Sequence, residues 1–130
     1  MKVIKSEKEW KKILTSEAFM VLRKKGTEPP FTGKYVHQDA TGTYICAGCG
    51  NLLFSSETKF ESRSGWPSFS APFGPDAVLL KEDNRFSTKR TEVVCAQCDG
   101  HLGHVFDDGP QPTGKRYCIN SVSLRFIEKK

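Results

Sequence analysis

Two Cys-x-x-Cys pairs constrain the fold of this 130-residue chain more than any other feature. Cys46 and Cys49 form the first pair, and Cys95 and Cys98 form the second. Each pair lies between a predicted strand and a turn that contains glycine, an arrangement that directs two sulfurs toward one point. Two such turns supply four thiolates, which is a tetrahedral ligand set that suits Zn²⁺. The sequence therefore predicts one structural zinc ion per chain.

Two other uses of these cysteines have to be weighed. A thioredoxin-like redox Cys-x-x-Cys normally occurs once, at the start of a helix within a βαβ unit, and neither pair has that setting. A Cys₂His₂ set could in principle combine Cys95 and Cys98 with His101 and His104. Such fingers, however, place about a dozen residues between the cysteine and the histidine pairs. We therefore expect both histidines to be free of metal, and two histidines three residues apart in a glycine-rich loop favour a functional site.

Length and composition favour one soluble globular domain over residues 1–130. Hydrophobic residues make up 37% of the chain and charged residues 27%, which is ordinary for such a domain. The longest apolar run, Ala18 to Leu22, has five residues, too few for a membrane-spanning helix. Residues 1–8 lack the apolar segment of a signal peptide. A cytoplasmic location with no membrane partner is expected by default.

The net charge of +5 arises mainly in the first 40 residues, which carry nine Lys or Arg against five Asp or Glu. A nucleic-acid-binding protein more often concentrates basic residues in a stripe with aromatic residues between them. Here the basic residues fit the solvated face of a helix. We therefore expect no nucleic-acid partner.

The pattern of apolar residues predicts a mainly β domain with a helical N-terminal segment at about residues 6–26. Ser6 and Glu9 form a capping box for a helix over residues 7–14. Thr15 or Ser16 caps a second helix that ends near Gly26. The zinc-binding β part covers about residues 33–127, with strands expected at residues 43–46, 51–54, 77–81, 92–95 and 116–127.

Cys118 is the cysteine left over from the two pairs. A free cysteine often serves as a small core residue, so this interpretation stays open. On a strand, however, Cys118 shares its face with the polar residues Arg116 and Asn120, and a nearby cation or donor favours the reactive thiolate. The turn Gly65-Trp66-Pro67-Ser68-Phe69 is equally open, because its aromatic residues suit either a core anchor or an apolar wall for a thioether.

The chain resembles the B-type methionine-R-sulfoxide reductases in several ordered motifs. These are Gly33-Lys34-Tyr35, both Cys-x-x-Cys pairs, the Gly-Trp-Pro-Ser-Phe turn, the run from Thr91 to Pro110, and Arg116-Tyr117-Cys118-Ile119-Asn120-Ser121. The resemblance covers nearly the whole chain. It implies a β-tent fold of two antiparallel sheets, with the zinc ion on the side away from the active site.

The resemblance also implies an activity and residue roles. The reaction is reduction of the R epimer of methionine sulfoxide in oxidised proteins or peptides, and free methionine sulfoxide is a further candidate substrate. Cys118 is implied as the nucleophile, and His101 and His104 as the residues that bind and protonate the sulfoxide oxygen, supported by Asn120. Trp66, Phe106 and Arg116 are implied as substrate-binding residues. Thioredoxin or another thiol is the implied reductant, and we expect a monomer.

One position departs from the family pattern. Many members carry a recycling cysteine just before the Gly-Trp-Pro-Ser-Phe turn, where this chain has Ser64. The usual intramolecular disulfide is therefore not expected. Two non-enzymatic classes remain as alternatives: a zinc-ribbon binding module, and a β-tent ligand-binding domain that uses an aromatic cage. A zinc-dependent deaminase is disfavoured, because no His-x-Glu element accompanies a cysteine pair.

Overall fold

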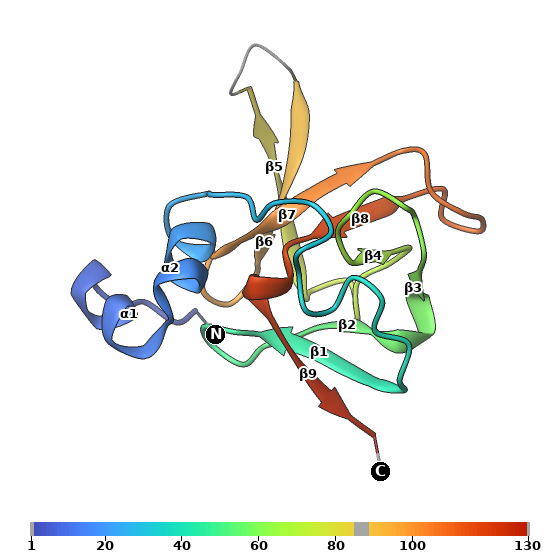
Figure 1. Ribbon diagram of the computed structural model, residues 1–130. Helices are drawn as coiled ribbons and strands as arrows, with labels where there is room; N and C mark the ends of the chain where they lie inside the picture. The colour runs from blue at the N-terminus through green and yellow to red at the C-terminus, as the bar shows by residue number, and fades with distance from the viewer. Residues whose placement is uncertain (1, 85–88, 130) are drawn as a thin grey trace.

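Two antiparallel sheets and two short N-terminal helices form the architecture seen in the computed structural model, which describes residues 2–84 and 89–129 (Figure 1). The ends of the expected domain, residues 1 and 130, lie outside this description. The three-stranded sheet has the order β2-β1-β9, and the six-stranded sheet has the order β3-β4-β8-β7-β6-β5. The prediction of a mainly β fold with two antiparallel sheets and N-terminal helices is confirmed. The strands of the small sheet are β1 (Gly42–Cys46), β2 (Leu52–Ser55) and β9 (Leu124–Glu128).

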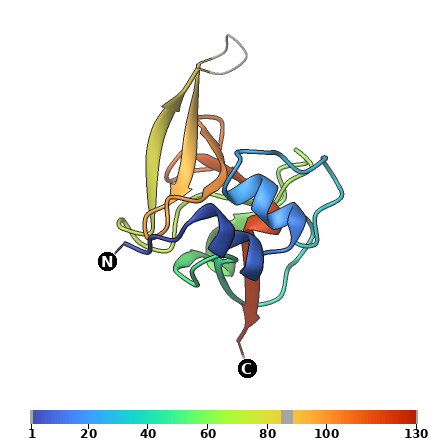
Figure 2. The same ribbon diagram turned by 90° about the vertical axis from the view of Figure 1, so that its left-hand side faces the viewer.

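The six-stranded sheet carries the residues of the candidate active site. Its long strands β5 and β6 extend away from the rest of the molecule as a projecting pair (Figures 1 and 2). The predicted strands match the observed ones to within two residues at each end, apart from the last. The strands of this sheet are β3 (Lys59–Phe60), β4 (Ser68–Phe69), β5 (Val78–Asp83), β6 (Arg90–Cys95), β7 (His101–Phe106) and β8 (Arg116–Ile119), with the 3₁₀ turn η1 (Ser56–Thr58) before β3.

An aromatic core joins the two sheets. Tyr44 on β1 and Phe54 on β2 are fully buried and both contact Phe69 on β4. The Phe54 and Phe69 rings stack with centroids 4.4 Å apart. A bulge in the β1–β2 pairing inserts Leu53 as an extra residue, so that Leu53 and Phe54 are both buried although they are neighbours. Burial of these large side chains is the main force that holds the sheets together.

The helices α1 (Glu7–Ile13) and α2 (Ser16–Leu22) lie together on one side of the molecule (Figure 2) and contact the turns of the two cysteine pairs. The predicted capping box of Ser6 and Glu9 is present. Trp10 of α1 is buried against Gly48, inside the first Cys-x-x-Cys turn. Arg23 stacks on Trp10 and donates to the carbonyl of Cys98 at 2.9 Å. The helical segment thus packs on both cysteine turns.

The prediction of one continuous strand over residues 116–127 is wrong. The strand β8 ends at Ile119, a 3₁₀ turn η3 (Ser121–Ser123) follows, and β9 then enters the other sheet. Asn120 Nδ2 donates to the carbonyl of Leu102, and Ser123 Oγ donates to that of His101. Because these polar side chains bond to backbone groups, they favour a turn over a further stretch of strand.

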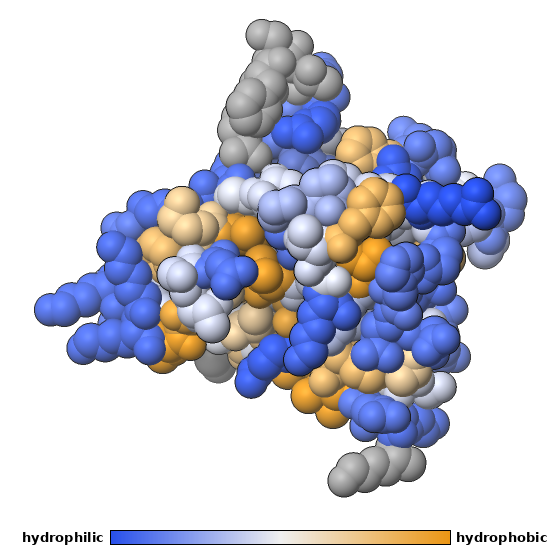
Figure 3. Space-filling model, in the orientation of Figure 1, coloured by the Kyte–Doolittle hydropathy of each residue, from blue (hydrophilic) through white to orange (hydrophobic). Residues whose placement is uncertain are grey.

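The surface is largely hydrophilic, with hydrophobic side chains in separate patches on the face shown in Figure 3. None of the helices in the described ranges has the length and apolar character needed to span a membrane. The lysines of α1, such as Lys11 and Lys12, are exposed, in agreement with a solvated basic helix face.

Candidate active site

Cys118 lies at the centre of the six-stranded sheet. The strand β8 is paired on one side with β4 and on the other with β7, so Cys118 is opposite both Ser68 and His104. Its side chain borders a cavity of about 240 Å³. The cavity is lined by Thr27, Ser64, Trp66, Arg90, Gly103, His104, Phe106, Arg116, Cys118 and Asn120.

The cavity brings together six of the seven residues expected to act in catalysis or substrate binding. The exception is His101, which is 1% exposed and does not line the cavity. A larger groove of about 570 Å³ runs between the helices and η3. That groove is lined by neither cysteine nor histidine among the described residues, so it lacks the nucleophile and the acid of a reductase.

The two histidines lie on the strand β7, not in the loop that the flanking glycines suggest. Residues three apart on a regular strand point to opposite faces. Here the β6–β7 pairing contains a bulge in which Leu102 is the extra residue, because Val93 pairs with Gly103 and Val94 with His101. The bulge returns both imidazoles to the same side, with ring centroids 5.4 Å apart.

Each imidazole is held by a buried carboxylate. Nδ1 of His101 and Oε2 of Glu92 are 2.7 Å apart, and Nε2 of His104 and Oδ2 of Asp83 are 2.8 Å apart. The sequence analysis did not identify either carboxylate as part of the site. For Glu92 the sequence does contain a signal of burial, because this acid directly precedes the apolar run Val93-Val94-Cys95. In the structure Glu92 is only 1% exposed. A buried acid in such a strand needs a partner.

The site shifts the pKa values of Cys118 and His104 in opposite directions. Burial raises the pKa of the Cys118 thiol, while a hydrogen bond to Ser64 and the charge of Arg116 oppose this change. Burial lowers the pKa of His104, and the hydrogen bond to Asp83 opposes that change. The resting site therefore favours a neutral thiol beside a neutral imidazole.

Arg116 and Phe106 form one wall of the cavity. The guanidinium carbon of Arg116 lies 4.5 Å from the centroid of the Phe106 ring. Arg116 also pairs with Asp108 through Nε at 2.9 Å and Nη2 at 3.3 Å, which raises the pKa of the arginine. This pairing fixes the guanidinium next to Cys118.

The cavity is also lined by Trp66 and by an N-terminal arm that sequence reasoning did not assign to the site. Trp66 donates its indole N–H to the carbonyl of Glu28 at 2.9 Å. The buried Glu28 side chain accepts from the backbone N–H of Val122 at 3.0 Å. Thr27, the preceding residue, lines the cavity. The Pro29-Pro30 pair marks an extended arm in the sequence but does not indicate where that arm packs.

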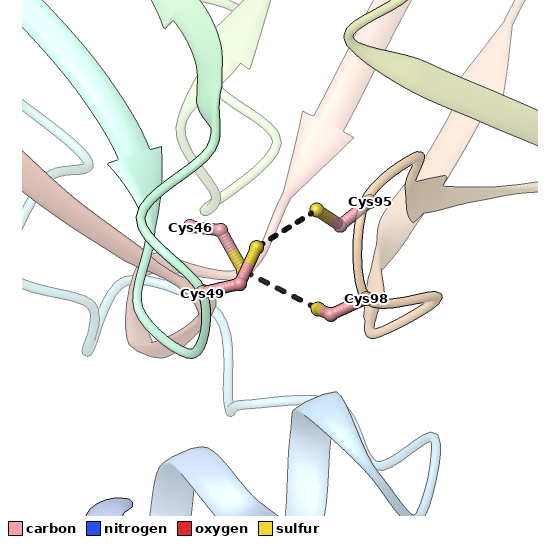
Figure 4. A group of neighbouring side chains, drawn as sticks. All are labelled: Cys46, Cys49, Cys95 and Cys98. Atoms are coloured by element: carbon pink, nitrogen blue, oxygen red, sulfur yellow. Dashed lines mark hydrogen bonds between the residues drawn. The ribbon is translucent and has the colours of Figure 1, made fainter. Parts of the chain in front are cut away.

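The four remaining cysteines form a separate cluster (Figure 4), and none of them lines the cavity. Cys46 and Cys95 end the strands β1 and β6, Cys49 and Cys98 lie in the turns that follow, and the four side chains point toward one another. All four sulfurs lie within 4.8 Å of one another, and the closest pairs are Cys49–Cys95 at 3.5 Å and Cys46–Cys98 at 3.7 Å. A tetrahedral zinc ion with Zn–S bonds of about 2.3 Å needs sulfurs about 3.8 Å apart. The four cysteines are thus positioned to bind a metal ion.

The chain belongs to the SelR domain family, whose model matches residues 14–128. Eight curated relatives that match this chain at 51–61% identity carry one name, peptide methionine sulfoxide reductase MsrB. The protein of Methanosarcina barkeri is 61% identical over 124 residues, covering 95% of this chain and 87% of the relative. That of Methanosarcina mazei is 57% identical over 129 residues, covering 99% and 92%. That of Leptospira interrogans is 56% identical over 124 residues, covering 95% of each chain. These matches confirm the resemblance to the B-type reductases.

Proposed function

We propose that the chain reduces the R epimer of methionine sulfoxide in oxidised proteins or peptides, with Cys118 as the nucleophile. As a member of this family the chain is an oxidoreductase of the methionine sulfoxide reductase class. The observation that carries the proposal is the single cavity in which a cysteine, an imidazole, a carboxamide and an indole meet.

The reaction begins with attack of the Cys118 thiolate on the sulfoxide sulfur. The sulfur–oxygen bond breaks, and the oxygen must receive a proton because oxide is a poor leaving group. The products are methionine and a Cys118 sulfenic acid, so the cysteine is oxidised as the substrate is reduced. The attack forms a bond between the two sulfurs, and the oxygen leaves as water after it has received two protons. A water molecule then attacks the Cys118 sulfur and breaks the sulfur–sulfur bond, which releases methionine, places the oxygen on the cysteine and returns one proton.

His104 is the proton donor that the geometry favours. Its Nε2 is engaged by Asp83, so its Nδ1 remains to meet the sulfoxide oxygen. His101 is buried behind it and supports the neighbouring imidazole and strand. Asn120 has one Nδ2 proton on the carbonyl of Leu102 and a second one to offer to the substrate.

Trp66 provides the apolar surface for the substrate methyl group. Its ring orientation is set by the hydrogen bond to Glu28. Phe106 and Arg116 complete the binding surface from the other side. A peptide backbone would lie outside the cavity, because its volume of about 240 Å³ suits a side chain rather than a folded segment.

Recycling of the enzyme uses an external thiol, either thioredoxin or a small-molecule thiol. A thiol condenses with the sulfenic acid to give a mixed disulfide and water, and a second thiol releases Cys118. Ser64 lies where an internal partner would be, with its Oγ 3.5 Å from the Cys118 sulfur. The four other cysteines are engaged in the metal-ligand cluster.

The four-cysteine cluster holds one Zn²⁺ in a structural role. Four thiolates leave no open coordination position, so the ion ties the two turns together and takes no part in the reduction. We propose that residues 1–130 work as one domain, because the helical segment packs on the cysteine turns. The proposal also includes a monomeric, cytoplasmic enzyme with no membrane or nucleic-acid partner.

The test is turnover with separated R and S epimers of a methionine sulfoxide peptide and a dithiol reductant. Activity on the R epimer alone is expected, and Cys118→Ser should abolish it while zinc content stays unchanged. Equal turnover of both epimers would contradict the proposed selectivity. Absence of turnover with intact zinc binding would instead favour a non-enzymatic binding module.

A further inference from the structure

Three serine hydroxyls form a continuous chain that ends on the sulfur of Cys118. Ser68 Oγ and Ser62 Oγ are 2.6 Å apart, and Ser62 Oγ and Ser64 Oγ are 2.8 Å apart. Ser64 Oγ lies 3.5 Å from Cys118 Sγ. Ser68, at the inner end, is 1% exposed and is the strand partner of Cys118 in the β4–β8 pairing.

Each hydroxyl in this chain has one proton to donate, so a thiolate at Cys118 allows a single direction that satisfies all three bonds. A thiol allows more than one arrangement, because Ser64 Oγ can also donate to the carbonyl of Trp66 at 3.5 Å. In one of these arrangements Cys118 donates to Ser64, Ser64 to Ser62 and Ser62 to Ser68. Ser68 then donates to the carbonyl of Trp66, at 3.1 Å. When Cys118 is a thiolate, the direction reverses, and Ser68 donates to Ser62, Ser62 to Ser64 and Ser64 to the sulfur.

We propose that this serine chain reverses direction as Cys118 loses its proton, so that Ser64 acts as a hydrogen-bond donor to the thiolate and Ser62 and Ser68 position it. The inference rests on the proposed function only in taking Cys118 as the reacting atom. It assigns a role to Ser64, whose position in the family pattern is otherwise occupied by a recycling cysteine.

Two backbone contacts strengthen the serine hydroxyls as donors. The N–H of Ser64 donates to Ser62 Oγ at 3.2 Å, and the N–H of Trp66 donates to Ser64 Oγ at 3.4 Å. An oxygen that already accepts a hydrogen bond is a better donor to the next group, so these contacts strengthen the bond that Ser64 donates once the sulfur is a thiolate. A donor to a buried thiolate offsets part of the cost of its burial.

Other ionisable groups also act on Cys118 and must be held constant in any test. Arg116 lies on the same strand as Cys118, and Asp108 lies in the loop after β7. His104 faces Cys118 from β7, and Arg90 lines the same cavity from β6. Removing one serine hydroxyl leaves all four in place. A serine variant therefore isolates the contribution of the hydroxyl chain.

The experiment is the pH dependence of Cys118 alkylation by iodoacetamide, followed by mass spectrometry of the peptide that contains it. Ser64→Ala is expected to raise the midpoint by about one pH unit, a tenfold change in the acid dissociation constant. Ser64→Thr, which keeps a hydroxyl, is expected to retain the wild-type midpoint. Ser62→Ala is expected to raise it by less, because Ser64 can still donate without its supporting partner.

Ser70→Ala is the matched control, since Ser70 follows the same strand β4 and lies outside the chain. An unchanged midpoint in Ser64→Ala, or an equal shift in Ser70→Ala, would overturn the inference. Alkylation needs no substrate, so the result is independent of reductase activity. A shifted midpoint in a protein that reduces no methionine sulfoxide would refute the proposed function and leave the serine chain standing.

Discussion

The backbone N–H of Glu28 donates to Oδ1 of Asn120 at 3.0 Å, across 92 positions of sequence. Since Asn120 Nδ2 donates to the carbonyl of Leu102 at 2.9 Å, the orientation of the carboxamide is fixed at both ends. The Asn120 side-chain oxygen faces the N-terminal arm at Glu28, and the side-chain nitrogen faces Leu102 of β7. Two distant segments thereby set the direction of a group at the cavity wall.

Asn120→Asp is expected to destabilise the protein and to lower turnover. The new carboxylate oxygen would replace Nδ2 and face the Leu102 carbonyl without a proton to share. A buried mismatch of this kind costs about 1–3 kcal/mol. Urea unfolding and steady-state kinetics would measure the two effects. A variant as stable and as active as the wild type would show that the carboxamide is not held as described.

Replacing Cys49 or Cys95 by serine is expected to release the metal and to destabilise the fold. The two turns are then no longer joined, and metal binding of this type contributes about 10–16 kcal/mol to the apparent folding free energy of small domains. Native mass spectrometry and thermal unfolding would report metal content and stability. A metal-free chain that unfolds at the wild-type temperature would contradict the structural role.

The pH profile of kcat/KM is expected to show a flat maximum between the pKa of His104 and that of Cys118. The pKa of His104 is lowered from 6.5, and that of Cys118 is raised from 9.0. The reactive form requires a protonated imidazole and a thiolate, and its concentration is constant between these two pKa values. The rate therefore falls below the first pKa and above the second.

Asp83→Asn should move the acid limb of that profile to lower pH. Its hydrogen bond raises the pKa of His104, so its loss lowers that pKa further and also lowers the plateau. His104→Ala should reduce turnover by about 10²–10⁴-fold with no loss of zinc, as expected for a general acid. Movement of the acid limb to higher pH in Asp83→Asn would exclude His104 as its source.

Gly103→Ala should displace Cys118 and abolish most of the activity. An added Cβ at Gly103 would collide with the backbone carbonyl oxygen of Cys118 on the paired strand. Gly74→Ala is the control, because no atom lies within 4 Å of a Cβ built there and its φ is not in the left-handed region. Circular dichroism and turnover of both variants would separate local displacement from unfolding. Full activity in Gly103→Ala would mean that the two strands tolerate a wider spacing.

Ser64→Cys should introduce the internal disulfide that the wild-type chain lacks. Ser64 Oγ and Cys118 Sγ are already 3.5 Å apart, so a small adjustment brings two sulfurs within bonding distance. A single turnover without reductant should then yield a 64–118 disulfide, whereas the wild-type protein should yield a sulfenic acid at Cys118. Peptide mapping distinguishes the two products. A disulfide between Cys118 and a metal-ligand cysteine in the wild type would refute the external-thiol route.

The features predicted correctly from the sequence are those encoded locally. The capping box of Ser6 and Glu9 and the turns of the two cysteine pairs depend on residues a few positions apart. The bulge that brings His101 and His104 to the same side is not encoded locally, because it arises from the pairing of β6 with β7. The carboxylate partners Asp83 and Glu92 and the Glu28 arm likewise become neighbours of the site only through tertiary packing. The break after β8 was missed because Cys-Ile-Asn-Ser-Val alternates like a strand, and the side-chain bonds that favour a turn are long-range.

The pairing of β1 with β9 has a consequence for how the protein reaches this structure. Thr43 is paired with Ile127, so the small sheet closes only after the chain between them has been brought together. Closing such a long loop costs conformational entropy, and proteins whose contacts are mostly between distant residues fold slowly. A metal ion bound between Cys49 and Cys95 would shorten the remaining loop before any sheet is complete. Refolding in the presence of zinc is thus expected to be faster as well as more favourable.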